Sequence, residues 1–365
     1  MSIGRSSSGI LQNRGWTADI ETASSECVNA ITVELSRFLI FIFISSLAFG
    51  GEVRDTFTLG CNLPWLDGRM GWDVAYKPEW GCGFDEAKVD RYFADMHRMG
   101  AKVVRWWLLA DMRGGVIFDE DGYPTGVYPE LFEHMDYVMG RICPKYGIRI
   151  YWCLLSGLLN TDHFNVIVDE KARRAYIRNV LIPIARRYGD HPYLFAFDLM
   201  NEPESDVKGP SGNWSLRGTD WNTMRGFLRE CADAIHRVAP KAKASVGSGW
   251  HGWKNVAKGK YKGLGLDFYD FHIYTDSTYL PPVKSLKLDK PCLIGEYNVR
   301  EETAKDEGRQ AELVGRFLRE AREKGYMGVL IWSYDHPESK SPHALLRPDG
   351  SWKRVAWGIK RLSEE

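Results

Sequence analysis

The sequence predicts an α/β fold, a single-domain closed (β/α)8 TIM barrel, and three observations lead to this prediction. From residue 57 onward, short apolar runs without a helical period alternate with longer runs that have one. Eight such strand–helix pairs follow one another, an alternation that favours a parallel sheet. The chain has 365 residues, which is enough for a barrel of about 250 residues with insertions.

The eight predicted strands are short runs of aliphatic and aromatic residues. Such runs are typical of strands that are buried on both faces of a parallel sheet. In chain order they cover residues 57–61, 103–108, 149–155, 194–199, 244–247, 268–273, 291–295 and 329–332.

The predicted helices show apolar residues at a 3.6-residue period and residues that favour helix ends. Asp85 suits the N-cap of the first helix, Pro129 suits a first turn, and Gly147 suits a helix stop. The segments after the fifth and sixth strands predict only weak helices, and Pro281-Pro282 argues against a long one. The remaining helices are expected at residues 169–188, 221–235, 311–325 and 351–362.

Residues 1–50 form an N-terminal extension with a signal-peptide-like hydrophobic segment. Arg37 precedes an apolar run over residues 38–49, with small residues near its end. This run is shorter than the roughly twenty residues that span a membrane. Because a leader normally lies nearer the start of a chain, we hypothesise that translation begins close to Val33. The sequence thus predicts an exported protein, secreted or periplasmic, with an uncleaved N-terminal membrane anchor as the alternative.

Composition excludes several classes of partner. The formal net charge is zero and no basic stripe stands out, so we expect no nucleic-acid partner. No CxxC or Cys/His spacing occurs, so we expect no metal and no cofactor. Cys61 and Cys82 flank the first long loop and are the one pair to test for a disulfide, whereas Cys153, Cys231 and Cys292 lie in apolar runs that predict buried thiols.

Two glutamates, Glu202 and Glu296, directly follow or end predicted strands four and seven. The carboxyl ends of barrel strands gather at one face, where barrel enzymes place their active sites. Cleavage of a glycosidic bond needs one carboxylic acid to protonate the leaving group and a second carboxylate to attack or stabilise the oxocarbenium ion. The pair therefore predicts a glycosidase site.

Further polar and aromatic residues are expected at the same face. A cation or a hydroxyl group beside Glu296 would keep that carboxylate ionised, an amide could hold the sugar 2-hydroxyl, and an indole could lie under the reacting ring. Each residue also has a structural alternative, as an internal ion pair, a core histidine or barrel-rim packing. The candidates are Arg105, Asn201, Trp250, His272, Tyr274 and Trp332.

The order of these motifs resembles clan A glycoside hydrolases, and most closely glycoside hydrolase family 5, the cellulase family. Asn201-Glu202-Pro203, His272-Ile273-Tyr274, Glu296 and Trp332 follow strands four, six, seven and eight, and the resemblance covers residues 57–362. It implies that Glu202 is the general acid/base and Glu296 the nucleophile of a retaining mechanism. One departure is that strand three ends without a His, and His163, further along the loop, is the candidate substitute.

We therefore expect residues 55–365 to form the catalytic domain of a retaining glycoside hydrolase. Its substrate would be an oligo- or polysaccharide with β linkages, such as a glucan or mannan. A catalytically silent carbohydrate-binding barrel is the alternative, which the complete carboxylate pair disfavours. A metal-dependent barrel hydrolase is a third class. It would need a His-x-His pair near the first strand, and residues 60–65 contain no His.

Overall fold

The computed structural model describes residues 57–66, 74–75, 77, 83–209, 218–249, 252–335 and 341–365. The predicted leader, Cys82 and Trp250 lie outside these ranges, so the expectations placed on the leader and on Trp250 stay predictions. Within the described residues, no helix has the length and apolar character needed to cross a membrane.

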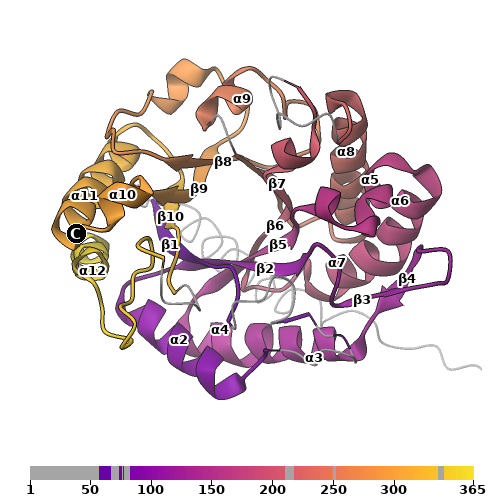
Figure 1. Cartoon of the computed structure of the whole chain (residues 1–365), viewed down its shortest axis with the longest axis horizontal. Coiled ribbons are helices and arrows are strands. Elements are labelled where there is room, and N and C mark those ends of the chain that lie inside the picture. The colour runs from indigo at the N-terminus through magenta and orange to yellow at the C-terminus, as the bar shows by residue number, and fades with distance from the viewer. Residues whose placement is uncertain are drawn as a thin grey trace, which may run out of the picture. The chain divides into compact units, whose positions relative to one another are not determined.

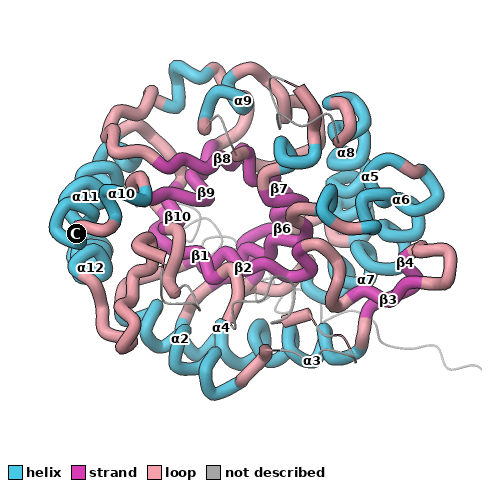
Figure 2. Tube along the Cα trace, in the orientation of Figure 1, coloured by secondary structure: helices cyan, strands magenta, loops and turns pink. Residues whose placement is uncertain are grey.

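Eight parallel strands close into a barrel, which confirms the predicted fold class. Figures 1 and 2 show these strands as an inner ring with helices outside it. Around the ring the order is β1-β10-β9-β8-β7-β6-β5-β2, so each strand lies beside its neighbours in the chain. The barrel strands are β1 (Thr58–Leu63), β2 (Val103–Ala110), β5 (Arg149–Leu155), β6 (Leu194–Asn201), β7 (Ala244–Ser248), β8 (Tyr269–Tyr274), β9 (Cys292–Asn298) and β10 (Gly328–Ile331).

The outer helices begin and end close to the predicted signals. Asp85 caps the first of them by accepting a hydrogen bond from the backbone N–H of Lys88 at 2.8 Å. Gly147 ends the second segment in the left-handed region, with φ 64°. The helices are α2 (Glu86–Arg98), α3 (Pro129–Tyr137), α4 (Cys143–Tyr146), α5 (Asn165–Val168), α6 (Glu170–Tyr176), α7 (Ile182–Tyr188), α8 (Trp221–Val238), α9 (Trp253–Ala257), α10 (Glu301–Ala304), α11 (Glu307–Glu323) and α12 (Arg354–Glu364).

Two predicted helices contain a π-helical turn that the sequence analysis did not foresee. These turns cover Val138–Ile142 and Ile177–Leu181, and each lies just before a proline, Pro144 or Pro183. Proline has no N–H and clashes with the carbonyl four residues earlier. The wider turn accommodates this break, and the helix continues on the same side of the barrel.

A short antiparallel hairpin also lies in the loop after β2. It consists of β3 (Val116–Phe118) and β4 (Pro124–Val127). Its strands are too short to produce a clear alternating pattern in the sequence.

The barrel interior is layered, and the layers place the site. Along β2, Val103 lies in a buried apolar cluster at the amino end of the strand, which is called the lower end here. Arg105 follows, and Trp107 lies in a second cluster near the carboxyl end. Side chains two residues apart on a strand share one face. The lower cluster joins Val103, Tyr151, Phe195, Ala196, Phe268, Leu293 and Leu330. A polar layer around Arg105 therefore lies between an apolar floor and an aromatic upper layer.

Candidate active site

Glu202 is positioned by an unusual backbone conformation directly after β6. Its φ and ψ are 45° and 59°, the left-handed region that non-glycine residues seldom occupy. Its N–H donates to the carbonyl of Gly247 at 2.7 Å, and the 3-10 turn Pro203–Asp206 follows. His272 Nδ1 lies 2.9 Å from Glu202 Oε1. The sharp turn directs this carboxyl group toward β8 instead of along the strand.

Glu296 lies within β9 and is almost fully buried, with 3% of its surface exposed. Arg105 Nη1 donates to its Oε1 at 2.6 Å, and the hydroxyl of Tyr274 donates to its Oε2 at 2.7 Å. Both contacts favour a negatively charged carboxylate. Arg105, Tyr274 and Glu296 thus meet as the sequence predicts.

The two carboxylates lie close together. One oxygen of Glu202, one oxygen of Glu296 and one ring nitrogen of His272 lie within 4.8 Å of one another. Retaining glycosidases hold their carboxyl groups about 5–5.5 Å apart, whereas inverting enzymes need about 6.5–9.5 Å to admit a water. The observed spacing suits direct attack on the sugar by one carboxylate.

Arg105 is fully buried and uses all of its N–H groups. Besides Glu296, it donates to Asp198 from Nε at 3.0 Å and from Nη2 at 2.7 Å. It also donates to Asn62 Oδ1 at 3.0 Å and to Asn201 Oδ1 at 2.7 Å. Because every partner restrains the planar guanidinium, the cation beside Glu296 has one fixed orientation.

The electrostatic environments of the two glutamates differ. Burial raises the pKa of Glu202 from 4.5 to about 7, with Asp198 adding to the effect and Arg105 opposing it. Burial also lowers the pKa of His272 from 6.5 to about 4, so its ring is neutral near pH 7. Glu202 therefore keeps a proton that it can donate, while Glu296 has a cation and a hydroxyl donor on its oxygens.

The same three ligand atoms could in principle surround a metal ion. Arg105 already places its positive charge 2.6 Å from the Glu296 oxygen, however. A metal ion bound to the same oxygen would lie within a few ångströms of the guanidinium, and the repulsion between two cations in a buried site would be costly.

Asp198 and Asn62 belong to this site, although the sequence analysis did not select them. Both are completely buried and hold Arg105. A charged residue inside the apolar run of β6 was the available signal for Asp198, because such a residue needs a partner when buried. Asn62 had a weaker signal, as a polar residue near the end of β1.

Tryptophans form one wall beside the polar layer. Trp107 lies with its ring centroid 5.5 Å from that of Trp65 and 5.9 Å from that of Trp332. Trp332 is partly exposed. Trp107 Nε1 is buried and has no hydrogen-bond partner among the described residues. Trp107 was not among the predicted site residues, since one aromatic residue in an aromatic strand gives no distinct signal.

Asn201, His163 and Cys61 have structural partners of their own. Asn201 donates from Nδ2 to Ser156 Oγ at 3.3 Å, while Arg105 holds its Oδ1. His163 Nδ1 lies 2.8 Å from the Asp111 carbonyl, and its ring stacks on that of Phe118 in β3 with centroids 4.2 Å apart. Cys61 is a buried free thiol in contact with Met96 Sδ at 3.3 Å. The expected buried thiols Cys153, Cys231 and Cys292 are confirmed.

Comparisons with known proteins agree with this geometry. The model for cellulase (glycosyl hydrolase family 5) matches residues 159–337. A mannan endo-1,4-beta-mannosidase of Mytilus edulis is 27% identical over 74% of this chain and 79% of its own length. Another, from Cryptopygus antarcticus, is 25% identical over 83% of this chain and 90% of its own length.

Solved structures share the fold. The endo-1,4-beta-mannanase of Eisenia fetida aligns with a TM-score of 0.67 and 20% identity, over 87% of this chain and 92% of that one. The beta-1,4-mannanase of Aplysia kurodai gives 0.65 and 22%, over 85% and 93%. The catalytically silent alternative finds no support, because these relatives are named as enzymes. Through residues 159–337 the chain matches glycoside hydrolase family 5, and it is a retaining glycosidase that acts on β-linked glycans.

Proposed function

We propose that Glu202 is the general acid/base and Glu296 the nucleophile of this glycosidase, and that the substrate is a β-1,4-linked mannan cleaved within the chain. The observation that carries the proposal is the close approach of two carboxyl groups in opposite environments. The mannan assignment rests on the relatives that are named as mannan endo-1,4-beta-mannosidases.

The reaction proceeds in two displacements. In the first, Glu202 donates its proton to the glycosidic oxygen, and a Glu296 oxygen attacks the anomeric carbon as the bond to the leaving group breaks. In the second, Glu202 accepts a proton from water, and that water displaces Glu296 from the sugar with restored anomeric configuration.

The remaining candidates support this chemistry. Arg105 and Tyr274 stabilise the charge on Glu296 before attack, through contacts of 2.6 and 2.7 Å. His272 orients the carboxyl group of Glu202. Asn201 is held by Arg105 so that its amide can reach the sugar 2-hydroxyl. Trp332, and Trp250 beyond the described residues, provide stacking surfaces for sugar rings.

The substrate also suggests where the enzyme works. A mannan polymer is met outside the cell, which agrees with the leader-like segment in residues 1–50. We therefore propose that residues 55–365 act as an exported catalytic domain.

Kinetics of single variants test the roles. With a β-1,4-manno-oligosaccharide, Glu202→Ala and Glu296→Ala are each expected to lose at least about 100-fold in kcat/KM. An aryl β-mannoside serves as substrate for the azide experiments. Azide added to Glu296→Ala should give the α-mannosyl azide, because it enters the space of the missing nucleophile. Azide added to Glu202→Ala should give the β-mannosyl azide, because it attacks the covalent intermediate.

Other outcomes would contradict the proposal. Near-normal activity of Glu296→Ala would refute its role as nucleophile, and faster hydrolysis of a β-1,4-glucan than of mannan would refute the substrate. Loss of activity with a chelator would point to metal-dependent hydrolysis instead.

A further inference from the structure

Glu204 is a buried acidic residue that the proposed mechanism does not use. It lies in the 3-10 turn two residues after Glu202, and its surface is 0% exposed. Burying a carboxylate is costly unless hydrogen bonds compensate for the lost water. The residue therefore needs a structural or functional explanation.

Four donors converge on the two oxygens of Glu204. Oε1 accepts from Ser248 Oγ at 2.7 Å, from Asn255 Nδ2 at 2.9 Å and from the Tyr261 hydroxyl at 2.6 Å. Oε2 accepts from the backbone N–H of Gly249 at 3.0 Å. Burial raises the pKa of Glu204, while the hydrogen bonds from Ser248, Tyr261 and Asn255 favour its ionised form.

All four donors lie at the end of β7 or in the segment that follows it. Ser248 ends that strand, Gly249 comes next, Asn255 lies in α9, and Tyr261 follows that helix. A side chain from the loop after β6 thus fixes the course of the loop after β7. This loop leads directly to Trp250, one of the predicted sugar contacts.

Gly249 in turn lies against the carboxyl group of Glu202. A Cβ atom at residue 249 would lie 2.3 Å from Glu202 Cδ and 2.7 Å from Oε1. Side chains cannot approach so closely, so only glycine leaves room for this carboxyl group. The Gly249 backbone is therefore one wall of the space that holds the Glu202 carboxyl group, which also contacts His272 Nδ1.

We propose that Glu204 is a positioning residue for Glu202: by binding the N–H of Gly249 and the Ser248 hydroxyl, it holds the backbone wall against which the acid/base lies. The inference rests on the proposed role of Glu202. Glutamine cannot replace Glu204, because Oε1 accepts from the Asn255 amide and Oε2 from the Gly249 N–H, so an amide NH2 at either position would face a donor that cannot accept.

The test uses leaving-group dependence, which reports on proton donation. Glu204→Gln should lower kcat/KM for a β-1,4-manno-oligosaccharide by about 10- to 100-fold, because small displacements of a catalytic group are this costly. A 2,4-dinitrophenyl glycoside of the same sugar needs little protonation of its leaving group, so its kcat/KM should fall less than about threefold. Gly249→Ala should give the same selective loss with Glu204 intact.

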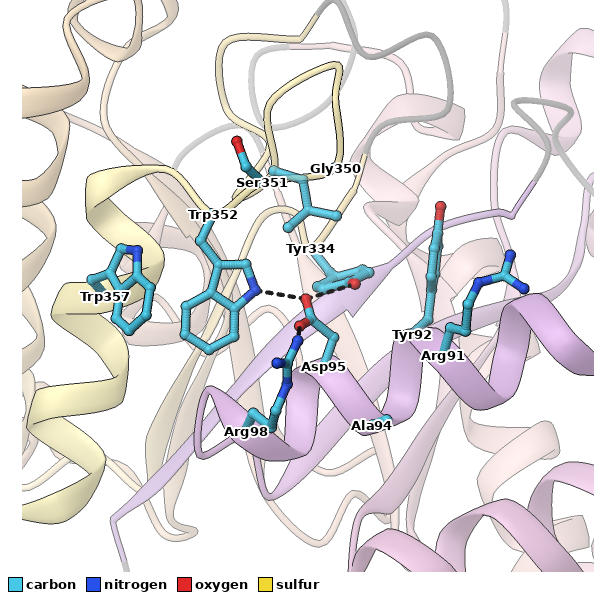
Figure 3. Close-up of a pocket in the computed structure, with 11 residues that line it drawn as sticks. Arg91, Tyr92, Ala94, Asp95, Arg98, Tyr334, Gly350, Ser351, Trp352 and Trp357 are labelled. Carbon is cyan, nitrogen blue, oxygen red and sulfur yellow. Dashed lines mark hydrogen bonds and ion pairs between the residues drawn. The ribbon is translucent and has the colours of Figure 1, made fainter.

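Asp95 offers a matched control at a distant place in the fold. It is also nearly buried, and its Oδ2 accepts from the Tyr334 hydroxyl at 3.0 Å and from Trp352 Nε1 at 2.8 Å. Figure 3 shows these contacts, which join α2 to the C-terminal part of the chain. Asp95→Asn should lower the thermal midpoint without changing the ratio of the two kcat/KM values.

Each result decides the question. Equal losses on both substrates, or no loss, in folded Glu204→Gln would overturn the inference. If that variant is unfolded at the assay temperature, Ser248→Ala, which removes one donor to Glu204 and does not overlap Glu202, decides by the same criterion. Glu202→Ala is measured alongside: if it too fails to discriminate between the substrates, the proposed role of Glu202 is wrong, whereas discrimination by Glu202→Ala alone rejects only the role of Glu204.

Discussion

Glu202→Gln should separate the energetic cost of burying this acid from its use in catalysis. Burial raises the pKa of Glu202 from 4.5 to about 7. Above pH 4.5 the unfolded chain releases the proton, whereas the native chain keeps it until about pH 7. The native state therefore loses stability as pH rises through this window. At about 1.4 kcal/mol per tenfold change in proton affinity, the difference between the two pKa values corresponds to a loss of about 3 kcal/mol in the free energy of unfolding.

His272 has the opposite effect on the pH dependence of stability, so in the wild-type protein it offsets the effect of Glu202. Burial lowers the pKa of His272 from 6.5 to about 4, and its contribution to stability is lost as pH falls from 6.5 to about 4. Between about pH 4.5 and 6.5 the native pair holds one proton, on Glu202, and the unfolded pair also holds one, on His272. The free energy of unfolding is then insensitive to pH as far as this pair is concerned.

Urea unfolding of wild type and Glu202→Gln at pH 4.5 and pH 8 measures the difference. The variant should be inactive on oligosaccharides, and its stability relative to wild type should be about 3 kcal/mol more favourable at pH 8 than at pH 4.5. Glu323→Gln, an exposed position on α11, should show no such pH dependence. The same stability difference at both pH values would refute the reasoning.

Two further substitutions test the groups around Glu296. Arg105→Lys leaves too few N–H donors for Asp198, Asn62, Asn201 and Glu296. Thermal and urea melts should therefore show that the protein loses about 3–5 kcal/mol of stability, and kcat/KM should fall about 100-fold or more. Nearly normal kinetics in folded Arg105→Lys would contradict this. Tyr274→Phe removes one hydrogen bond at a site that is 38% exposed, so stability should fall by no more than about 1.5 kcal/mol while kcat falls about tenfold or more. An unchanged kcat would show that the hydroxyl does not act on Glu296.

The sequence predicted the barrel because each strand and each long helix has its own local signal. The strand at residues 149–155 was predicted with its observed ends, and the caps at Asp85 and Gly147 act as expected. Glu202 and Glu296 could be placed at one face because the carboxyl ends of parallel strands meet there. These features need no knowledge of which side chains touch.

Partners across the barrel could not be predicted in the same way. Arg105 meets Asp198 across 93 positions of sequence, and this contact depends on strand register and on the irregular pairing near the carboxyl end of β6. Glu204 is a similar case, because its donors come from a later loop whose course the sequence does not specify. The π-helical turns also depend on how a proline break is absorbed within a packed helix.

The double contact of Arg105 has a consequence for the covalent intermediate. When the sugar is attached to Glu296 in the proposed mechanism, that residue becomes a neutral ester and no longer balances the guanidinium. Asp198 remains 2.7 Å from Arg105 Nη2, so the buried cation keeps a counterion throughout turnover. An arginine paired with Glu296 alone would lose its counterion each time a sugar is attached to Glu296. Here Asp198 keeps the buried charge balanced while the intermediate forms.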